Sequence, residues 1–548
     1  MEVIPAMTDA PRVSKRALSA VVASAVAPSG ELHRSIDWKG AFWVASGVPA
    51  LVLFSIGSIA ATVGSPSWLV WSVSIVFGFF QSFVYAEIAG LFPNKAGGAS
   101  VYGAMAWLRY SKFVAPVSVW CNWMAWSTVL AIGSGLAAGY ILTALFPADA
   151  AIHTKQITLL DLGFLTEGLA LRLNAQFVIA AALLLLCFAV QHHGILQAAR
   201  VQTVVGLAVL IPLLIVGIVP FLTGDVVRQN FEPFAPLNGA WNAQGWTLFA
   251  GGLFLAAWST YGFETAVCYT REFKNPEKDT FKAIFYSGLL CLVMFILVPL
   301  AFQGALGVER LTSEDIVAGT GVAAAMASMI SSGPGAAVGN VLVVMLVLAL
   351  LLSIMTSMAG TARTLYQGSV DGWLPKYLGH VNRHGAPTRA MWTNLTFNFI
   401  LLMMSDYVFV LAASSVCYII FNFLNLNAGW LHRVDSPDTP RPWRAPTVLL
   451  AIGVFLSFVN ALLMGWGANV WGDGALITGL VAAALILPVF LFRHYVQDKG
   501  VFPSSLYEGL GVSEGGHLAK RAGILPYLVL IGGAFIVFLG HLLARMAG

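Results

Sequence analysis

One carboxylate is prominent because it lies inside a long apolar segment. Glu264 ends the stretch Trp-Ser-Thr-Tyr-Gly-Phe-Glu within the apolar run 246–270. Polar groups at mid-membrane depth are costly unless they face a cavity or a partner. The sequence therefore predicts a break from Ser259 to Glu264 that helps to bind a substrate. The alternative is a buried, protonated Glu264 bonded to the unwound backbone of the first helix. The residues assigned to this break are Trp258, Ser259, Thr260, Tyr261, Gly262, Phe263 and Glu264.

A second interruption falls in the middle of the apolar run 40–63. Pro49 lacks an N–H and clashes with the carbonyl four residues before it, and Gly47 tolerates non-helical angles. We therefore expect the helix to unwind there, although Pro and Gly also occur in membrane helices without a functional role. The residues assigned to this second break are Gly47, Val48, Pro49, Ala50 and Leu51.

Aromatic and hydroxyl side chains near the breaks are further candidates for binding. The rings of Trp258, Tyr261 and Phe263 can hold an apolar or cationic part of a substrate, and we favour them over Trp126. Aromatic residues make up 12% of the chain, so any one of them can equally be core. Hydroxyl groups can bind substrate or Na⁺, a hard cation that prefers oxygen ligands, or can simply pack helices closely. The candidate hydroxyls are Ser414 and Ser415 for substrate and Ser353, Thr356 and Ser357 for Na⁺.

The amino-acid composition indicates whether these residues lie in a water-soluble protein or in a membrane protein. The chain has 548 residues, of which 58% are hydrophobic and 10% charged, whereas about 25% are charged in soluble proteins. A net charge of +4 is too small to coat a phosphate backbone, which excludes a nucleic-acid partner. The five cysteines lie in apolar runs without a metal-ligand spacing, and no metal or cofactor is expected. These features predict a multi-pass membrane protein with a lipid bilayer around it.

Runs of about 20 apolar residues predict membrane helices. We expect thirteen of them, at 40–63, 67–91, 113–146, 174–193, 199–222, 246–270, 283–303, 335–365, 390–404, 406–431, 447–468, 474–494 and 523–546.

Orientation follows from the basic residues, which favour the cytoplasmic side. With the N-terminus inside, five of the 29 Lys and Arg lie outside and the other 24 inside. An odd number of helices then places the C-terminus outside. The outer five are Lys155, Arg172, Arg228, Arg310 and Arg545.

The two breaks fall in the first and sixth helices, which suggests two corresponding halves. Helices one to five and six to ten start on opposite sides of the membrane, the pattern of inverted-repeat secondary transporters. We therefore divide the chain into a cytoplasmic tail (1–38), a first repeat (39–222), a second repeat (246–431), helices eleven and twelve (447–494), and a cytoplasmic linker with helix thirteen (495–548).

Three further motifs resemble the amino acid-polyamine-organocation superfamily of permeases. The segment from Tyr85 to Pro93, followed by Gly97-Gly98 and Tyr102, is similar to the family signature at the end of helix two. Lys274-Asn275-Pro276 resembles the loop after helix six, and the segment from Asp371 to Pro375 the loop after helix eight. With the break at 258–264, four motifs lie in family order between residues 40 and 430.

This resemblance implies an all-α, five-plus-five inverted-repeat (LeuT-like) core with broken helices one and six. It implies an amino acid or related amine as substrate, with Tyr102 and Glu264 in gating and coupling and with Na⁺ or H⁺ as the coupling ion. The chain departs from the family pattern at Ala50-Leu51-Val52, where most members have a Gly-Ser-Gly-like, carboxylate-binding segment. Helix five also lacks the lysine that replaces Na⁺ in some relatives.

The first alternative is a transporter of a non-amino-acid organic amine or organic solute in the same fold, and two other classes of function are more remote. A membrane-embedded enzyme needs a catalytic constellation, and a channel needs a filter-like segment or a ring of charge; neither pattern is visible in the sequence. We expect Glu87, near the inner end of helix two, to pair with loop cations in a structural role. The sequence thus predicts a transporter in the cytoplasmic membrane with no catalytic residues.

Overall fold

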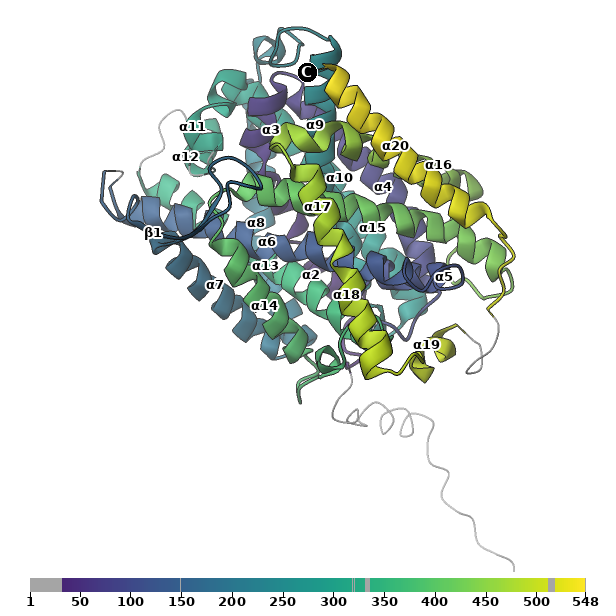
Figure 1. The fold of residues 1–548 in the computed structure, drawn as a ribbon. Helices are drawn as coiled ribbons and strands as arrows, with labels where there is room; N and C mark the ends of the chain where they lie inside the picture. Colours follow the sequence, from purple (N-terminus) through teal and green to yellow (C-terminus); the bar gives the residue numbers. More distant parts are fainter. Residues whose placement is uncertain are drawn as a thin grey trace, which may run out of the picture.

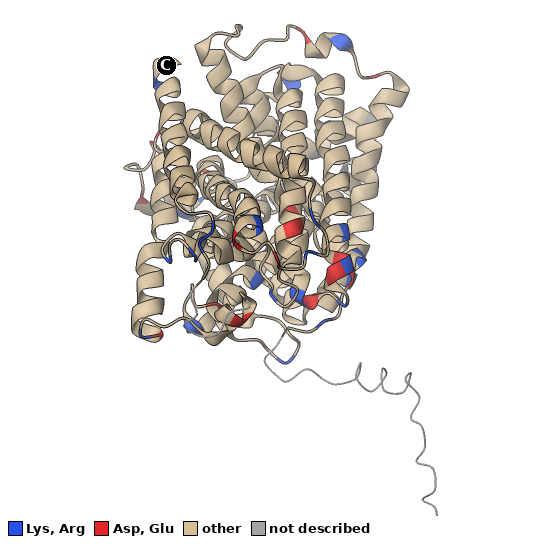
Figure 2. Ribbon diagram, turned by 90° about the vertical axis from the view of Figure 1, so that its right-hand side faces the viewer, with Lys and Arg blue, Asp and Glu red and all other residues tan. Residues whose placement is uncertain are grey.

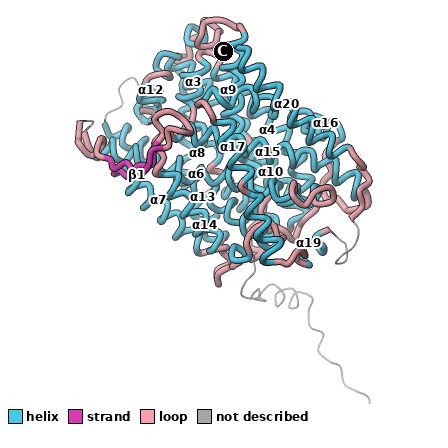
Figure 3. The backbone as a smooth tube through the Cα atoms, in the orientation of Figure 1, coloured by secondary structure: helices cyan, strands magenta, loops and turns pink. Residues whose placement is uncertain are grey.

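The computed structural model describes residues 32–147, 149–317, 319, 321–330, 336–510 and 518–547. Of the expected cytoplasmic tail, residues 1–31 therefore lie outside the described part. The described chain is a bundle of helices (Figure 1) with one short two-stranded sheet at its edge (Figure 3). The predicted class, an all-α polytopic membrane protein, is confirmed apart from this hairpin.

The first half of the core runs from α2 to α8. Its helices are α2 (Trp38–Val44), η1 (Val48–Phe54), α3 (Ile56–Val63), α4 (Ser67–Gly90), α5 (Ala99–Trp107), α6 (Ala115–Leu145), α7 (Ala175–His192) and α8 (Ile195–Thr223).

The second half runs from α9 to α15. Its helices are α9 (Ala243–Thr260), η3 (Gly262–Glu272), α10 (Pro276–Leu311), α11 (Glu314–Val317), α12 (Val322–Ile330), α13 (Ala336–Val370), η4 (Lys376–Gly379), α14 (Thr388–Leu402) and α15 (Tyr407–Asp435).

The C-terminal region adds helices outside this core. They are α16 (Thr447–Gly467), η5 (Ala468–Trp471), α17 (Ala475–Ala484), α18 (Ile486–Leu491), the π-helical η6 (Phe492–Gln497), α19 (Ser504–Gly509) and α20 (Leu525–Ala547). In Figure 1, α20 lies along the outer edge beside α16, against which it packs.

Eleven helical stretches of the described residues are long and apolar enough to cross a membrane. The other two expected spans are helical but fail these criteria. The 18 residues of α9 include Gln, Gly, Trp, Ser and Thr. The 15 residues of α14 extend only about 22 Å at 1.5 Å per residue, short of a hydrocarbon core of about 30 Å.

Packing between the halves agrees with an inverted repeat. The second helix of the first half, α4, packs against α10, its counterpart in the second half. The third helices, α6 and α13, also pack against each other. A twofold relation between the halves brings such equivalent elements together, and nearly all buried apolar side chains form one continuous core around them.

Side-chain caps fix where several helices begin. Asp37 accepts a hydrogen bond from the backbone N–H of Gly40 at α2, and Asn242 accepts one from Gly245 at α9. Asp406 accepts from two N–H groups at the start of α15. A cap satisfies backbone donors that a helix start leaves unpaired, so these caps determine where α2, α9 and α15 begin.

An antiparallel hairpin that the sequence analysis missed follows α6. Strands β1 (Gln156–Asp161) and β2 (Ala170–Asn174) form it. It is tied to the turn between α14 and α15, because the N–H of Arg172 donates to the Met403 carbonyl at 2.7 Å. The hairpin thus connects the two halves at the side we assign to the exterior.

Candidate substrate site and cytoplasmic gate

Both predicted breaks coincide with a change of helix type. The α-helical pattern of α2 ends at Val44, and the N–H groups of Val48 and Ala50 bond to carbonyls three residues back. Pro49 lies in the first turn of η1. In the sixth span, α9 gives way to η3 after Tyr261. The chain therefore tightens into 3₁₀ helix at both places, where the sequence analysis expected it to unwind.

A small cavity lies where η1 and η3 meet α6 and α13. It measures about 10 Å³, which is room for roughly one water molecule. The cavity is thus too small for an organic substrate, and helices one, three, six and eight all contribute to its wall. Its lining residues are Gly47, Val48, Leu51, Trp126, Val129, Thr265, Ser353, Thr356 and Ser357.

Trp126 of α6 is the central aromatic residue of the site. Its indole N–H donates to Glu264 Oε1 at 3.0 Å, and its ring lies 5.8 Å from Trp258 and 5.3 Å from Tyr418. A Cβ at Gly262 would lie only 2.6 Å from Trp126 Cη2. Gly262 therefore leaves the space that the indole ring fills.

Glu264 is buried, with 1% of its surface exposed. Besides Trp126, the side-chain amide of Asn122 donates to its Oε1 at 3.4 Å. Both partners belong to α6, so Glu264 joins helix six to helix three, where the structural alternative had placed it against helix one. None of the ion pairs within the described residues includes Glu264.

Thr265 is a site residue that the sequence analysis missed. Its side chain lines the cavity, and its hydroxyl has no hydrogen-bond partner among the described residues. A buried hydroxyl left unpaired costs free energy, which a bound polar ligand can recover. Its place directly after Glu264 was the only signal in the sequence.

Other candidates of the sequence analysis lie away from the cavity. The hydroxyl of Tyr261 donates to Asn460 of α16 at 3.1 Å, and the Trp258 indole donates to the Ala125 carbonyl. Phe263 packs on Gly288 of α10. The remaining ones make local bonds: Ser259 with the Leu51 carbonyl, Thr260 with Ser74, Ser414 with Thr128, and Ser415 with its own helix.

The three hydroxyls proposed for Na⁺ face helix one and helix three. Thr356 donates to the Val44 carbonyl at 2.6 Å, and Ser353 donates to the Gly47 carbonyl at 2.7 Å. Ser357 instead donates to the Trp126 carbonyl. Four oxygens, two of them carbonyls, thus gather between α2, η1 and α13.

Gln202 of α8 reaches into the same group of oxygens. Its Nε2 donates to the Val44 carbonyl at 3.1 Å and to Thr356 Oγ1 at 3.3 Å. A hydrogen-bond donor and a cation repel each other when both face the same oxygens. The Gln202 amide thus already bonds to two of the oxygens that a Na⁺ ion would use here. Across the described residues, no group of three or more His, Cys, Asp and Glu is placed to hold a metal.

A buried ion pair lies on the side of the site that the basic residues predict to be cytoplasmic. Lys95, between α4 and α5, lies 2.5 Å from Asp371, just after α13. The side chain of Gln367 supports both partners, because it accepts from the Ala96 N–H and donates to Asp371. The Tyr102 hydroxyl donates to the Lys95 carbonyl at 2.7 Å. Tyr102 therefore touches the gate segment, outside the substrate cavity.

A second buried pair joins η3 to α13. Arg363 NH2 donates to Glu272 Oε1 at 2.9 Å, and both side chains are almost fully buried. Between the two pairs, the N–H of Gly97 bonds to the Cys268 carbonyl of η3. The segment from Lys95 to Gly98, here called the wedge, is thus held between helices six and eight.

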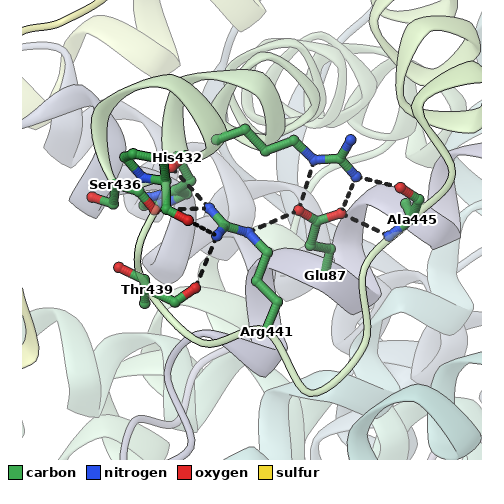
Figure 4. Close-up of polar contacts among 8 residues, drawn as sticks. Glu87, His432, Ser436, Thr439, Arg441 and Ala445 are labelled. Atoms are coloured by element: carbon green, nitrogen blue, oxygen red, sulfur yellow. Dashed lines mark hydrogen bonds and ion pairs between the residues drawn. The ribbon is translucent and has the colours of Figure 1, made fainter.

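Glu87 has the structural role expected from the sequence. It accepts hydrogen bonds from Arg433 at the end of α15, from Arg441 and from the backbone N–H of Ala445 (Figure 4). Arg441 also donates to the carbonyls of His432, Ser436 and Thr439. The carboxylate of Glu87 therefore fixes the loop after α15 against α4.

Comparison with known proteins identifies the family. The family described as "Amino acid permease" matches residues 36–489. The chain belongs to this family. The resemblance inferred from the four motifs is thereby confirmed, and the matched region of this permease spans the whole ten-helix core and α16 and α17.

Several characterised relatives are similar over most of the permease. A branched-chain amino acid permease of Lactococcus lactis is 25% identical over 78% of this chain and 88% of the relative. A polyamine transporter of Oryza sativa is 24% identical over 79% and 75%. A glutamate/serine transporter of Bacillus subtilis is 25% identical over 93% and 88%.

Proposed function

We propose that this permease is a secondary active transporter that moves an amino acid or related amine by alternating access. The observation that carries the proposal is the cavity between η1 and η3, in a chain that matches the family over 36–489. The relatives are named for transport of branched-chain amino acids, polyamines, and glutamate and serine. All of these contain an amino group, which favours an amine as the common feature.

The groups around the cavity favour recognition of an ammonium group. Glu264 is the acidic side chain beside it, and Val48, Leu51 and Val129 offer apolar contact. The backbone N–H groups of Val48 and Ala50 already bond to carbonyls within the tightened helix. With these donors occupied, a substrate carboxylate gains less here than in relatives with a Gly-Ser-Gly-like segment.

Uptake into proteoliposomes with matched substrate pairs tests this proposal. Each pair consists of an amino acid and the amine without its carboxylate, such as leucine and isopentylamine. We expect saturable, exchangeable uptake of an amine-bearing substrate, with the decarboxylated member retained as a competitor. A flux that rises linearly with concentration would indicate a channel, and turnover to a product would indicate an enzyme; either outcome contradicts the proposal.

Alternating access requires the cavity to enlarge. A space of about 10 Å³ does not hold an amino acid, so Trp126 or its neighbours must move for a substrate to enter. The hydrogen bond from Trp126 to Glu264 is the contact that a substrate ammonium would compete for. We infer that substrate binding releases this contact and thereby couples occupancy to motion of η3 against α6.

The coupling ion follows from the same geometry. Because the Gln202 amide group bonds to the oxygens that Na⁺ would need, we propose uptake that does not depend on sodium. Replacing Na⁺ by choline at constant pH should leave the initial rate unchanged, and a pH gradient should change it. A rate that falls severalfold in choline would contradict this proposal, while leaving the transport function intact.

A further inference from the structure

An apolar groove lies between α20 and the rest of the molecule. It has a volume of about 410 Å³, and all of its lining side chains are apolar. Phe423 of α15 and Ala461 of α16 contribute to it together with Val117 of α6 and Leu480 of α17. On α20 the wall includes Gly533 and Ala534.

The structure of α20 explains why the groove stays open. This helix is peripheral, since only 11% of its most apolar 18-residue stretch is buried. It packs along α16 and touches α9, while its side toward α17 faces the groove. A Cβ at Gly533 would lie 2.6 Å from Phe423 Cζ, so the glycine lets this phenyl ring pack directly against α20 at one wall of the groove.

The depth of the groove corresponds to the acyl region of one leaflet. Its lining residues on α20 run from Leu530 to Val537, five to twelve residues after the helix start at Leu525. At 1.5 Å per residue this is about 8 to 18 Å along the helix. Half of a hydrocarbon core is about 15 Å thick. A single acyl chain that enters from the membrane surface is therefore long enough to extend along the groove.

Basic side chains flank the surface end of the groove. Lys112 precedes the lining residue Val114 by two positions, and its Nζ donates to the hydroxyl of Tyr495 at 2.9 Å. Arg521 and Lys520 are exposed just before α20. Within the described residues, none of these three cations takes part in an ion pair with a carboxylate.

Tyr110 holds the two basic positions near each other. Its hydroxyl accepts from the Ala522 N–H at 3.2 Å, and its carbonyl accepts from the Tyr527 hydroxyl at 2.9 Å. Arg521 adjoins Ala522, and Lys112 lies two residues after Tyr110. The neighbouring carboxylate, Asp435, accepts from Tyr110 and from Ala522. The acid beside this end is thus already engaged. The Lys112 ammonium lies 4.9 Å from the centre of the Tyr495 ring as well as bonding to its hydroxyl, which places this cation beside Tyr495 without a carboxylate partner among the described residues.

We propose that this groove binds one acyl chain of an anionic phospholipid, with its phosphate held by Lys112, Lys520 and Arg521. An apolar groove that opens to lipid fills with hydrocarbon, and cations at the membrane surface attract anionic headgroups. The bound lipid joins α20 to α6 and α17, helices that α20 does not itself pack against. The site thus makes the attachment of the last helix depend on lipid composition.

Delipidated protein with added phosphatidylglycerol or phosphatidylcholine tests the proposal. Bound lipid is counted by native mass spectrometry, and the thermal midpoint is measured in parallel, because a ligand stabilises the state that binds it. We expect one tightly retained phosphatidylglycerol and a larger rise of the midpoint than with phosphatidylcholine. Equal retention and equal stabilisation by both lipids would overturn the proposal.

Two variants test the headgroup contacts and the acyl-chain groove separately. K112Q/R521Q removes two surface charges and should weaken phosphatidylglycerol binding by about tenfold or more. A534F fills the groove and should abolish retention of either lipid. The matched control is K278Q/K282Q, which removes two exposed charges at the start of α10, a different element, and should bind as wild type.

The variants also exclude other occupants of the groove. Wild-type affinity in K112Q/R521Q, or an equal loss in the control, would contradict the assigned headgroup contacts. A second copy of the chain seated on this face would appear as a dimer by mass photometry and would be lost in A534F. That outcome would replace the lipid and overturn the proposal.

Discussion

The geometry at a single glycine determines how the candidate site is packed. Because Gly262 has no side chain, the Trp126 ring lies against η3 and its indole N–H reaches Glu264. The same contact leaves a cavity of only about 10 Å³. The site therefore depends on three side-chain positions from helices that the sequence separates by more than 130 residues.

Replacing Gly262 with Leu should abolish transport without preventing membrane insertion. A Cβ there would lie 2.6 Å from Trp126 Cη2, so the larger side chain must displace the indole or separate η3 from α6. Binding by thermal shift and uptake in liposomes measure the effect, which we expect to be a loss of at least tenfold. Gly532→Leu is the control, because a Cβ at Gly532 meets only Phe458 at 3.8 Å. Normal uptake by the Gly262 variant would disprove this packing role.

Glu264→Gln should separate binding from transport. The amide retains an oxygen that can accept from Trp126 and Asn122, but it loses the charge that attracts an ammonium and the proton that can exchange. We expect the variant to bind substrate, to transport it about tenfold more slowly and to lose most of its dependence on pH. Initial rates from about pH 5 to pH 8 measure this. Wild-type rates throughout would show that Glu264 is purely structural.

The elements of the cytoplasmic side are held together by charge. Lys95 with Asp371 and Glu272 with Arg363 each connect α13 or its end to a different element. Separating a buried pair leaves a charge without its partner, at a cost of about 3 to 5 kcal/mol. We therefore expect any motion that separates these elements to require that both pairs separate together or find new partners.

Asp371→Asn should favour opening to the cytoplasm. The change leaves the buried Lys95 ammonium without its carboxylate and weakens the wedge over η3. Cys268 is a native reporter, because its carbonyl accepts from Gly97 and its thiol lies against Gly98. We expect labelling by a membrane-impermeant maleimide to rise severalfold.

Cys268→Ser in the same background supplies the control for labelling of the other cysteines, which are buried. Protection as complete as in the wild type would show that the ion pair does not hold the gate.

The runs of apolar residues predicted the membrane-spanning helices well, because the bilayer alone requires such runs. All thirteen expected spans are helical, and residue type indicated where the α-helical pattern of the first and sixth spans ends, although the chain there forms 3₁₀ helix and does not unwind as expected. The packing of the short helix α14 against α6 and α13 could not be predicted, because no local sequence pattern encodes it. The hairpin β1–β2 was missed because its contact outside the hairpin, from Leu171 to Met404 in the turn before α15, lies far away in the sequence.

Side-chain partners were predicted less well than helices. Trp126 was ranked below Trp258 and Tyr261 because those two lie beside the break in sequence, yet Trp126 lines the cavity. Gln202 and Thr265 went unnoticed, since an amide in α8 and a hydroxyl after Glu264 are unremarkable until α13 and η1 meet them. Sequence spacing places residues on one helix, but it does not specify which neighbouring helix they face.

The whole molecule has an uneven distribution of charge. In Figure 2 most of the blue and red segments lie in the half away from the marked C-terminus. The Lys95, Arg363 and Glu87 clusters belong to that half by sequence, since they follow α4, end α13 or end α4. Basic residues near helix ends favour the cytoplasmic side, so we expect this half to face the cytoplasm.

Reporter fusions at the two termini test the resulting topology. We expect a fusion at residue 1 to be active only as a cytoplasmic reporter and one at residue 548 only as an external reporter, because thirteen crossings separate the ends. A fusion in the hairpin after Asp161 should report the exterior, and one in the loop after Asp435 the cytoplasm.

If both termini report the same side, one helix does not cross. The internal fusions then distinguish α14, the shortest predicted span, from α20, the least buried one. A failure at α14 would invert α15 and move the Glu87 cluster away from Arg433, which the observed contacts forbid; α20 is therefore the helix whose crossing the experiment most directly tests.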